Sequence, residues 1–271
     1  MLLQPASHLQ TRRKFDPRQI SGLGLWLDAS DASTITIATG VSAWNDKSGN
    51  GRNFAQATGA NQPARISAGQ NGRNTVRGDG INDYMTMSSG FNLLRNVAGA
   101  TLVAVRKWVT SPSTSLTMLN ISIGGSVSPA RAALSGAVAT ANKASLGGRR
   151  TDVDIFASAE SAASVAAGFE IHLGLFDYAN SDVYQYINGS LDGSNTTFQT
   201  NGNTSDTDSA GVGLFANAGG FSLSHTEIGE MLVYPKALAV TDRQAVEGYL
   251  AHKWGIASSL PSTHPYRYAA P

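Results

Sequence analysis

The chain has 271 residues, a formal net charge of +1 and no cysteine. The length suits one large β domain, and the lack of cysteine excludes disulfides, thiolate metal sites and cysteine nucleophiles. Because only 14% of the residues are charged, the composition argues against nucleic acid or an anionic membrane as a partner.

The first segment, residues 1–20, is polar and basic and contains two prolines. It has too little apolar surface to fold by itself, so we interpret it as an extended N-terminal arm ahead of a single domain at residues 21–271. An alternative is that the arm folds back on its own domain through Phe15 and Ile20. In the first interpretation a partner orders the arm through cationic and aromatic side chains, which are Arg12, Arg13, Lys14, Phe15 and Arg18.

The arm lacks the apolar stretch of a secretory signal, and no later run is long and apolar enough to span a membrane. We therefore expect the protein to be made in the cytoplasm of a host cell. Four Asn-x-Ser/Thr sequons would matter only in a eukaryotic secretory route, and we interpret them as chance matches in a polar β protein.

A short polar run, AWNDKSGNGRNF, follows the first predicted strand and resembles part of an EF-hand loop. Asp46, Ser48 and Asn50 match its first, third and fifth ligand positions, and Gly51 matches its glycine. Ala57 stands where the bidentate glutamate should be, so a calmodulin-type site is excluded. Two hypotheses remain, a tight turn or a looser ion or sugar site, with Ca²⁺ as the cofactor that such a site could take.

Two-residue alternation of apolar side chains predicts strands through the middle of the chain. In FEIHLGLF the alternation predicts one buried face, with Glu170 and His172 on the opposite, solvated face. VYQYI leads into Asn188-Gly189, a strong hairpin signal because both residues accept positive φ. Further predicted strands are GLGLWLDA, DYMTM, TLVAVRKW, LTMLNISI, GVGLFA and TEIGEMLVY. The fold class is therefore all-β, a two-sheet antiparallel jelly-roll sandwich.

One helix is predicted near the C-terminus. Thr241 and Gln244 have the spacing of a capping box, and Gly255 is the predicted stop. Side chains at helical spacing should pack on the sandwich, and they are Val246, Tyr249, Leu250, Lys253 and Trp254. The same holds for the four tryptophans, which could stack on sugars but have the apolar neighbours of core residues, namely Trp26, Trp44, Trp108 and Trp254.

Catalytic chemistry has little support in the sequence. Retaining glycosidases need two carboxyls on one face, whereas Glu227 and Glu230 stand three residues apart and should point to opposite faces of a strand. We expect Glu230 to pair with an arginine instead. Glu170 and His172 could support a general acid, but no nucleophile accompanies them. The histidines have no metal-ligand spacing. The sequence thus predicts no catalytic residues.

Four stretches together resemble the LamG-like, concanavalin A-like lectin and glucanase jelly-roll domains of bacterial and bacteriophage proteins. They are GLWLDASDAST, VSAWNDKSGNGRNFAQATGANQPA, NGRNTVRGDGINDYM and IGEMLVYPKALAVTDRQAVEGYLAHKWGI, and they extend from residue 21 to about 256. One departure is Gly78, where relatives usually carry an aromatic residue. The resemblance implies a sandwich that binds glycans or proteins, sometimes with calcium, or that serves as a structural module.

These observations lead to two functional hypotheses. The first is a non-enzymatic bacteriophage virion structural protein, a capsid decoration or tail component anchored by its arm to other virion proteins or to copies of itself as a homo-oligomer. The alternative is a carbohydrate-binding receptor-recognition module for a bacterial surface glycan. A glycoside hydrolase is disfavoured because a same-face carboxylate pair is not predicted.

Overall fold

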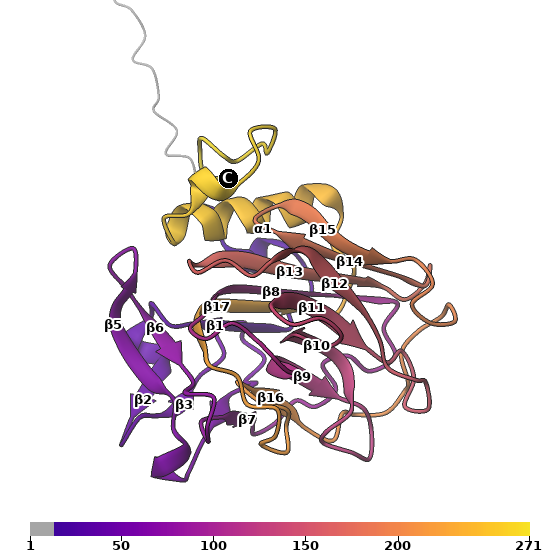
Figure 1. Cartoon of the computed structure of the whole chain (residues 1–271), viewed down its shortest axis with the longest axis horizontal. Helices are drawn as coiled ribbons and strands as arrows, with labels where there is room; N and C mark the ends of the chain where they lie inside the picture. The colour runs from indigo at the N-terminus through magenta and orange to yellow at the C-terminus, as the bar shows by residue number, and fades with distance from the viewer. Residues whose placement is uncertain (1–13) are drawn as a thin grey trace, which may run out of the picture.

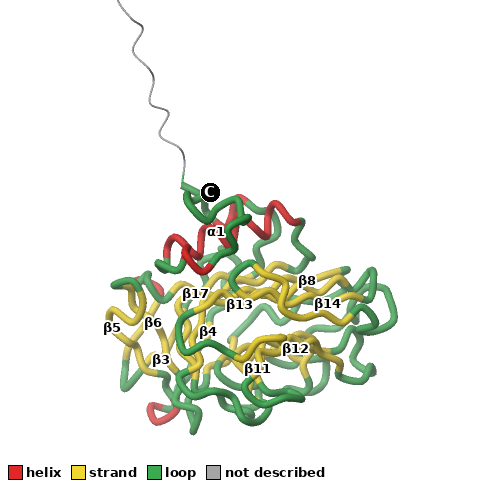
Figure 2. Tube along the Cα trace, turned by 45° about the horizontal axis from the view of Figure 1, so that its top comes forward, coloured by secondary structure: helices red, strands yellow, loops and turns green. Residues whose placement is uncertain are grey.

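The computed structural model describes residues 14–271 (Figure 1). Two antiparallel β-sheets pack face to face, and helix α1 (Val240–Lys253) lies across the outer face of one of them. Figure 2 shows the resulting order of helix, sheet and sheet. The predicted fold class, an antiparallel two-sheet sandwich with one C-terminal helix, is confirmed. Within the described residues, no helix is long and apolar enough to cross a membrane.

Sheet A, which lies under the helix, has eight described strands in the order β15-β14-β13-β8-β17-β6-β5, with β1 also paired to β17. Its strands are β1 (Leu25–Asp28), β5 (Ala64–Gln70), β6 (Arg73–Arg77), β8 (Gly99–Trp108), β13 (Glu170–Asp177), β14 (Asp182–Ile187), β15 (Ser190–Asn195) and β17 (Thr226–Tyr234). The predicted hairpin joins β14 to β15, with φ of 50° at Asn188 and 79° at Gly189.

Sheet B has nine described strands in the order β12-β11-β10-β9-β16-β7-β4-β3-β2. Its strands are β2 (Ile35–Ile37), β3 (Val41–Trp44), β4 (Phe54–Ala55), β7 (Met85–Met87), β9 (Leu116–Ser122), β10 (Ala130–Gly136), β11 (Lys143–Gly148), β12 (Ala157–Ser164) and β16 (Val212–Leu214). Short 3-10 helices occur at Pro17–Gln19, Ala32–Thr34, Gly59–Asn61 and Ala257–Ser259.

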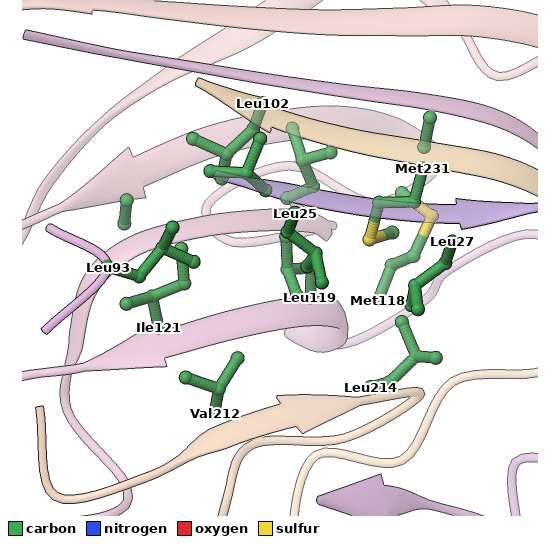
Figure 3. Close-up of a cluster of buried hydrophobic side chains, with 14 of the residues drawn as sticks. Leu25, Leu27, Leu93, Leu102, Met118, Leu119, Ile121, Val212, Leu214 and Met231 are labelled. Atoms are coloured by element: carbon green, nitrogen blue, oxygen red, sulfur yellow. The ribbon is translucent and has the colours of Figure 1, made fainter. Parts of the chain in front are cut away.

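The main core fills the space between the two sheets. Figure 3 shows part of it, where Leu102 and Met231 from sheet A face Leu119 and Leu214 from sheet B. All four tryptophans are buried, as predicted for core residues. A leucine or methionine side chain of this core stabilises the fold by about 1.5–3 kcal/mol when it is fully buried.

A second core lies between sheet A and helix α1, so sheet A is covered on both faces. Leu173 of β13 packs under the helix with Leu250 and Trp254, while Phe176 of the same strand faces sheet B. The prediction that Glu170 and His172 lie on a solvated face is therefore wrong: they are 4% and 0% exposed. The alternation correctly assigned the side chains of β13 to two faces. The face that carries Glu170 and His172 is buried because the second sheet packs against it.

Three residues of the predicted stripe of helix α1, Val246, Leu250 and Trp254, are fully buried, while Tyr249 and Lys253 are half-buried. The helix ends as expected, because Gly255 has a φ of 70°. Its beginning differs from the prediction. The N-cap is Ala239, and no side chain caps the first turn. Thr241 therefore lies inside the helix at its second residue, so the predicted capping box with Gln244 does not form.

The described part of the arm folds back on the domain. Phe15 packs against Tyr249 of helix α1 with ring centroids 5.7 Å apart, and Ile20 joins the second core at 6% exposure. The Tyr234 hydroxyl donates a hydrogen bond to the Pro17 carbonyl oxygen at 3.0 Å. Residues 14–20 thus have the contacts that the folded-back alternative predicted.

Candidate functional site

The predicted ligand loop is a turn whose carboxylate is occupied by protein donors. Asp46 accepts hydrogen bonds from the backbone N–H groups of Trp26, Ser48 and Arg52 and from the Ser48 hydroxyl, at 2.7–3.1 Å. The Asn50 amide donates to the carbonyls of Leu23 and Gly24. The loop is therefore fastened to β1, and a cation would have to displace N–H donors. Among residues 14–271, no three His, Asp or Glu side chains are grouped as metal ligands would be.

The structure describes only some of the residues that were predicted to anchor the arm. Arg12 and Arg13 lie outside the described residues, and Lys14 is exposed. Arg18 forms a two-point ion pair with Asp16, with nitrogen-to-oxygen distances of 2.7 and 2.9 Å. The guanidinium also lies 5.5 Å from the ring of Trp26.

Glu170 and His172 take part in a buried polar cluster between the sheets. Glu170 forms an ion pair with Arg106 at 2.6 Å, and the His172 imidazole contacts the Gln185 amide oxygen at 3.0 Å. Burial raises the pKa of Glu170, although Arg106 opposes this shift. Burial and the Arg106 charge hold the pKa of His172 well below its usual range. A neutral buried imidazole and a paired carboxylate suit a structural role.

Glu227 and Glu230 point to the same face, contrary to the prediction. The register of β17 against β8 shifts between Ile228 and Glu230, so Glu227 pairs with Lys107 and Glu230 with Val105. A β-bulge of this kind inserts one extra residue into the strand. Two residues that are three positions apart across the bulge therefore point to the same face of the sheet. The bulge lies at Gly229, where an added Cβ would be 2.8 Å from the Trp254 ring.

Both glutamates are buried and paired with lysine, so the prediction that Glu230 pairs with an arginine is wrong. Glu227 lies 3.2 Å from the Lys107 ammonium and accepts a hydrogen bond from Thr75. Glu230 lies 2.6 Å from Lys253 and accepts from the hydroxyl of Tyr249. It also accepts from the indole N–H groups of Trp26 and Trp254 at 2.7 and 2.8 Å. The Glu230 contacts fix the helix to sheet A, whereas the Glu227 contacts stay within the sheet, and protein donors occupy both carboxylates.

A hollow of about 140 Å³ lies on the outer face of sheet B, and we call it the sheet B groove. Leu119, Ile121 and Leu134 point into the main core, so Asn120 of β9 and Ala133 and Ser135 of β10, which alternate with them, point outward. The register of β9 against β10 shifts between Leu134 and Ser135, and this irregularity pairs Thr117 with Ser135 on the same outer face. These outward residues form the floor of the groove, and they are Thr117, Asn120, Ala133 and Ser135.

Two loops form the walls of this groove. One wall carries Arg149 and Phe156 from the β11–β12 connection, and a Cβ on Gly147 would lie 2.6 Å from the Phe156 ring. The opposite wall carries Asn217, whose amide donates to the Ser128 hydroxyl at 3.1 Å. Small floor residues such as Ala133 and glycine at 147 leave the space that the walls enclose.

The groove is polar but almost uncharged. Arg149 is its one charged lining residue among those described, and hydroxyls and amides supply most of its other polar groups. The Asn120 side chain is 2% exposed, and its Oδ1 has no hydrogen-bond partner among residues 14–271. A buried amide oxygen without a partner is costly, and a donor that enters the groove would satisfy it.

The groove was not among the sequence-predicted sites, because its strands β10, β11 and β12 were not predicted. They read ARAALSG, KASLGG and ASAESAAS, and Ala, Gly and Ser lack the apolar alternation and β-branched residues that mark a strand. The signal available in the sequence was indirect: three small-residue runs of strand length between turn-forming segments.

A larger hollow of about 380 Å³ lies beside the helix, between Phe15 and Lys253. Two of its basic groups are already engaged, since Arg73 donates to the Lys253 carbonyl at 2.8 Å and Lys253 binds Glu230. It also borders Lys14, where the described residues begin. The sheet B groove, whose lining lies well inside the described chain, is therefore the stronger candidate site.

No protein-family model and no curated protein matches the chain. Solved structures do match in fold. The binding domain of Paraclostridial Mosquitocidal Protein 1 has a TM-score of 0.59 at 11% identity, over 86% of this chain and 53% of that one. The botulinum neurotoxin serotype G binding domain has a TM-score of 0.57 at 12% identity, over 83% and 50%. Trypanosoma rangeli sialidase has a TM-score of 0.55 at 14% identity, over 86% and 33%.

The chain thus spans about half or less of the length of the structures it matches. At these identities the comparison establishes the fold. The sandwich is concanavalin A-like, as the sequence resemblance predicted, and it is shared with neurotoxin binding domains and with part of a sialidase.

Proposed function

We propose that this chain is a carbohydrate-binding module that takes a saccharide in the sheet B groove. The observation that carries the proposal is the groove itself, with a floor of uncharged hydroxyls and amides and a wall formed by the Phe156 ring. Saccharides present hydroxyls to such polar groups and apolar C–H faces to aromatic rings. Specific ligand sites combine a concave shape with a few convergent polar groups in this way.

The size of the groove fits a small ligand. Its 140 Å³ correspond to roughly ten positions of a water-sized group. A hexose has a similar number of non-hydrogen atoms, so one ring would enter and further residues of a glycan would lie outside. Phe221, whose backbone N–H donates a hydrogen bond to the groove residue Asn217, is 67% exposed.

The fold comparison supports the same class of ligand. One structure with this fold, over 83% of the chain, is described as showing that cell entry of botulinum neurotoxin type C depends on interaction with two ganglioside molecules. Another is described as the binding domain of Botulinum Neurotoxin DC in complex with SialylT. These are statements about those proteins, and they make a glycan the first ligand class to test here.

We also propose that binding is not followed by catalysis. The carboxylates of Glu170, Glu227 and Glu230 are each buried in an ion pair, which suits anchoring and not proton transfer to a substrate. The virion hypothesis, with its arm anchor, homo-oligomer and phage location, stays a prediction from the sequence. So does the bacterial surface as the source of the glycan.

A glycan array with the purified chain tests the proposal, and a groove variant locates the site. Ala133→Leu places a larger side chain on the groove floor, where we expect it to abolish array binding. Ala167→Leu makes the same change at an exposed loop position and should leave binding unchanged. Thermal melts of both variants show whether the fold is retained. Array binding that persists in a folded Ala133→Leu protein would refute the groove as the site.

A further inference from the structure

The charge of the sheet B groove is placed at one end. Arg149 follows Gly148 of β11, and its Nε donates to the Asp154 carbonyl oxygen at 3.0 Å. Its two terminal amino groups form no hydrogen bond and no ion pair with any residue of the described range 14–271. Its guanidinium carbon lies 5.7 Å from the Phe156 ring. The guanidinium is thus held in position by its inner nitrogen while its outer edge stays open.

The opposite end of the same face carries a carboxylate. Glu160 of β12 is aligned with Ser145 of β11, and Ser145 is aligned with Ser135 on the groove floor. Arg149 lies four residues after Ser145, which is about 13 Å along a strand. Glu160 is committed to the turn beside it, because it accepts hydrogen bonds from Ala139, Thr140 and Ser145. An anionic group on a ligand is therefore favoured at the Arg149 end and disfavoured at the Glu160 end.

We infer that the ligand is an acidic saccharide whose carboxylate is bound by the two terminal amino groups of Arg149 and whose hydroxyl donates to Asn120 Oδ1. This inference rests on the proposed function and specifies its ligand class. A guanidinium edge with two parallel N–H donors matches the two oxygens of a carboxylate. The buried Asn120 oxygen accepts a hydrogen bond, which a sugar hydroxyl supplies and a carboxylate does not.

Matched saccharide pairs test the inference. Methyl glucuronide and methyl glucoside differ only in the carboxylate, and an N-acetylneuraminic acid glycoside and its methyl ester form a second pair. NMR titration of the full chain should show that in at least one pair the acid binds roughly tenfold or more tightly than its neutral partner. A glucose 6-sulfate glycoside measures whether any anion suffices.

Substitutions of Arg149 assign the preference to that residue. Arg149→Gln should reduce affinity for the preferred acid roughly tenfold while changing affinity for its neutral partner less than about twofold. Arg149→Lys keeps the charge but not the planar fork, so it should recover only part of the loss. Arg65→Gln removes an exposed arginine on β5 of the other sheet and should change nothing.

The outcomes separate this inference from the proposed function. A preference for the sulfate overturns the carboxylate inference in favour of a general anion site. An acid preference that is unchanged in the Arg149→Gln protein overturns the assignment to Arg149. Equal binding of acid and neutral saccharides overturns the carboxylate inference and leaves the groove as a neutral glycan site. If neither pair binds while the array shows another, neutral glycan, the inference is overturned in the same way. If no saccharide binds in any format, the proposed function fails together with the inference.

Discussion

The side chains of Glu230 and Lys253 meet between sheet A and helix α1, with Oε2 and Nζ 2.6 Å apart. The same ammonium group lies 2.8 Å from Asp28 of β1. One lysine of the helix is therefore shared by two carboxylates on neighbouring strands of sheet A. Burial raises the pKa of Glu230, which Lys253 opposes. This cluster links the helix to β1 and β17.

We expect Lys253→Met to destabilise the fold by about 3–5 kcal/mol, because it leaves a buried carboxylate without its counter-charge. Urea unfolding at neutral pH measures the change. The double variant Lys253→Met with Glu230→Gln should recover part of the loss, since no buried charge then remains at position 230. A single variant that unfolds at the same urea concentration as the parent would show that the pair is not formed.

Trp254→Ala should cost about 3–5 kcal/mol. The ring is fully buried, lies against Gly229 and donates a hydrogen bond to Glu230. Thermal and chemical denaturation measure the effect. Tyr268→Ala is the matched control because its ring is 81% exposed, and it should leave stability within about 0.5 kcal/mol of the parent. Equal stability of the two variants would contradict the packing of helix α1.

Asp83 should make stability depend on pH. Burial, reinforced by the nearby Asp79 charge, raises its pKa from 3.8 to about 6. A raised folded-state pKa favours folding below the unfolded value, and this contribution is lost as pH rises through about 6. Asp83→Asn should therefore match the parent near pH 4 and exceed its stability by about 1–2 kcal/mol at pH 8.

Urea midpoints measured between pH 4 and 8 for parent and variant provide the test. The amide oxygen of asparagine can still accept the hydrogen bond that Asp79 N–H donates to Asp83. Asp208→Asn, at a side chain that is 56% exposed, should show no such divergence with pH. Curves for parent and Asp83→Asn that stay parallel from pH 4 to 8 would contradict the shift.

Phe15→Ala tests the role of the described part of the arm. The ring is half-buried against Tyr249, so its loss should lower stability by about 1–2 kcal/mol. Tyr234→Phe, which removes the hydrogen bond to the Pro17 carbonyl, should lower stability by about 1 kcal/mol. If both variants melt at the parent temperature, these arm contacts contribute nothing to the stability of the domain. That result would favour the anchor hypothesis.

Packing of Phe215 in the main core explains why position 78 is a glycine. Gly78 departs from the aromatic residue of similar domains, and in this structure the Phe215 ring occupies the adjacent space, 2.9 Å from where a Cβ on Gly78 would lie. An aromatic ring from another strand end thus fills that place. Packing of this kind couples residues 137 positions apart, so no local pattern predicts it.

Elements whose side chains carry a strong local signal could be predicted from the amino-acid sequence. The alternation in β13, the strand at β17, the Asn188-Gly189 turn and the apolar stripe of helix α1 follow from local backbone preference and periodicity, and they appear where predicted. These signals depend on residues close together in the chain.

The burial of each strand face and the position of the groove depend on contacts between segments that are distant in the chain. Glu170 is buried because a second sheet covers its face, and the bulge at Gly229 brings Glu227 and Glu230 to one face. The groove forms where strands of Ala, Ser and Gly leave space that loops distant in sequence enclose. The covering of a strand face, the register of two strands and the walls of a groove all depend on segments that meet only in the folded chain. A local sequence pattern therefore cannot encode them.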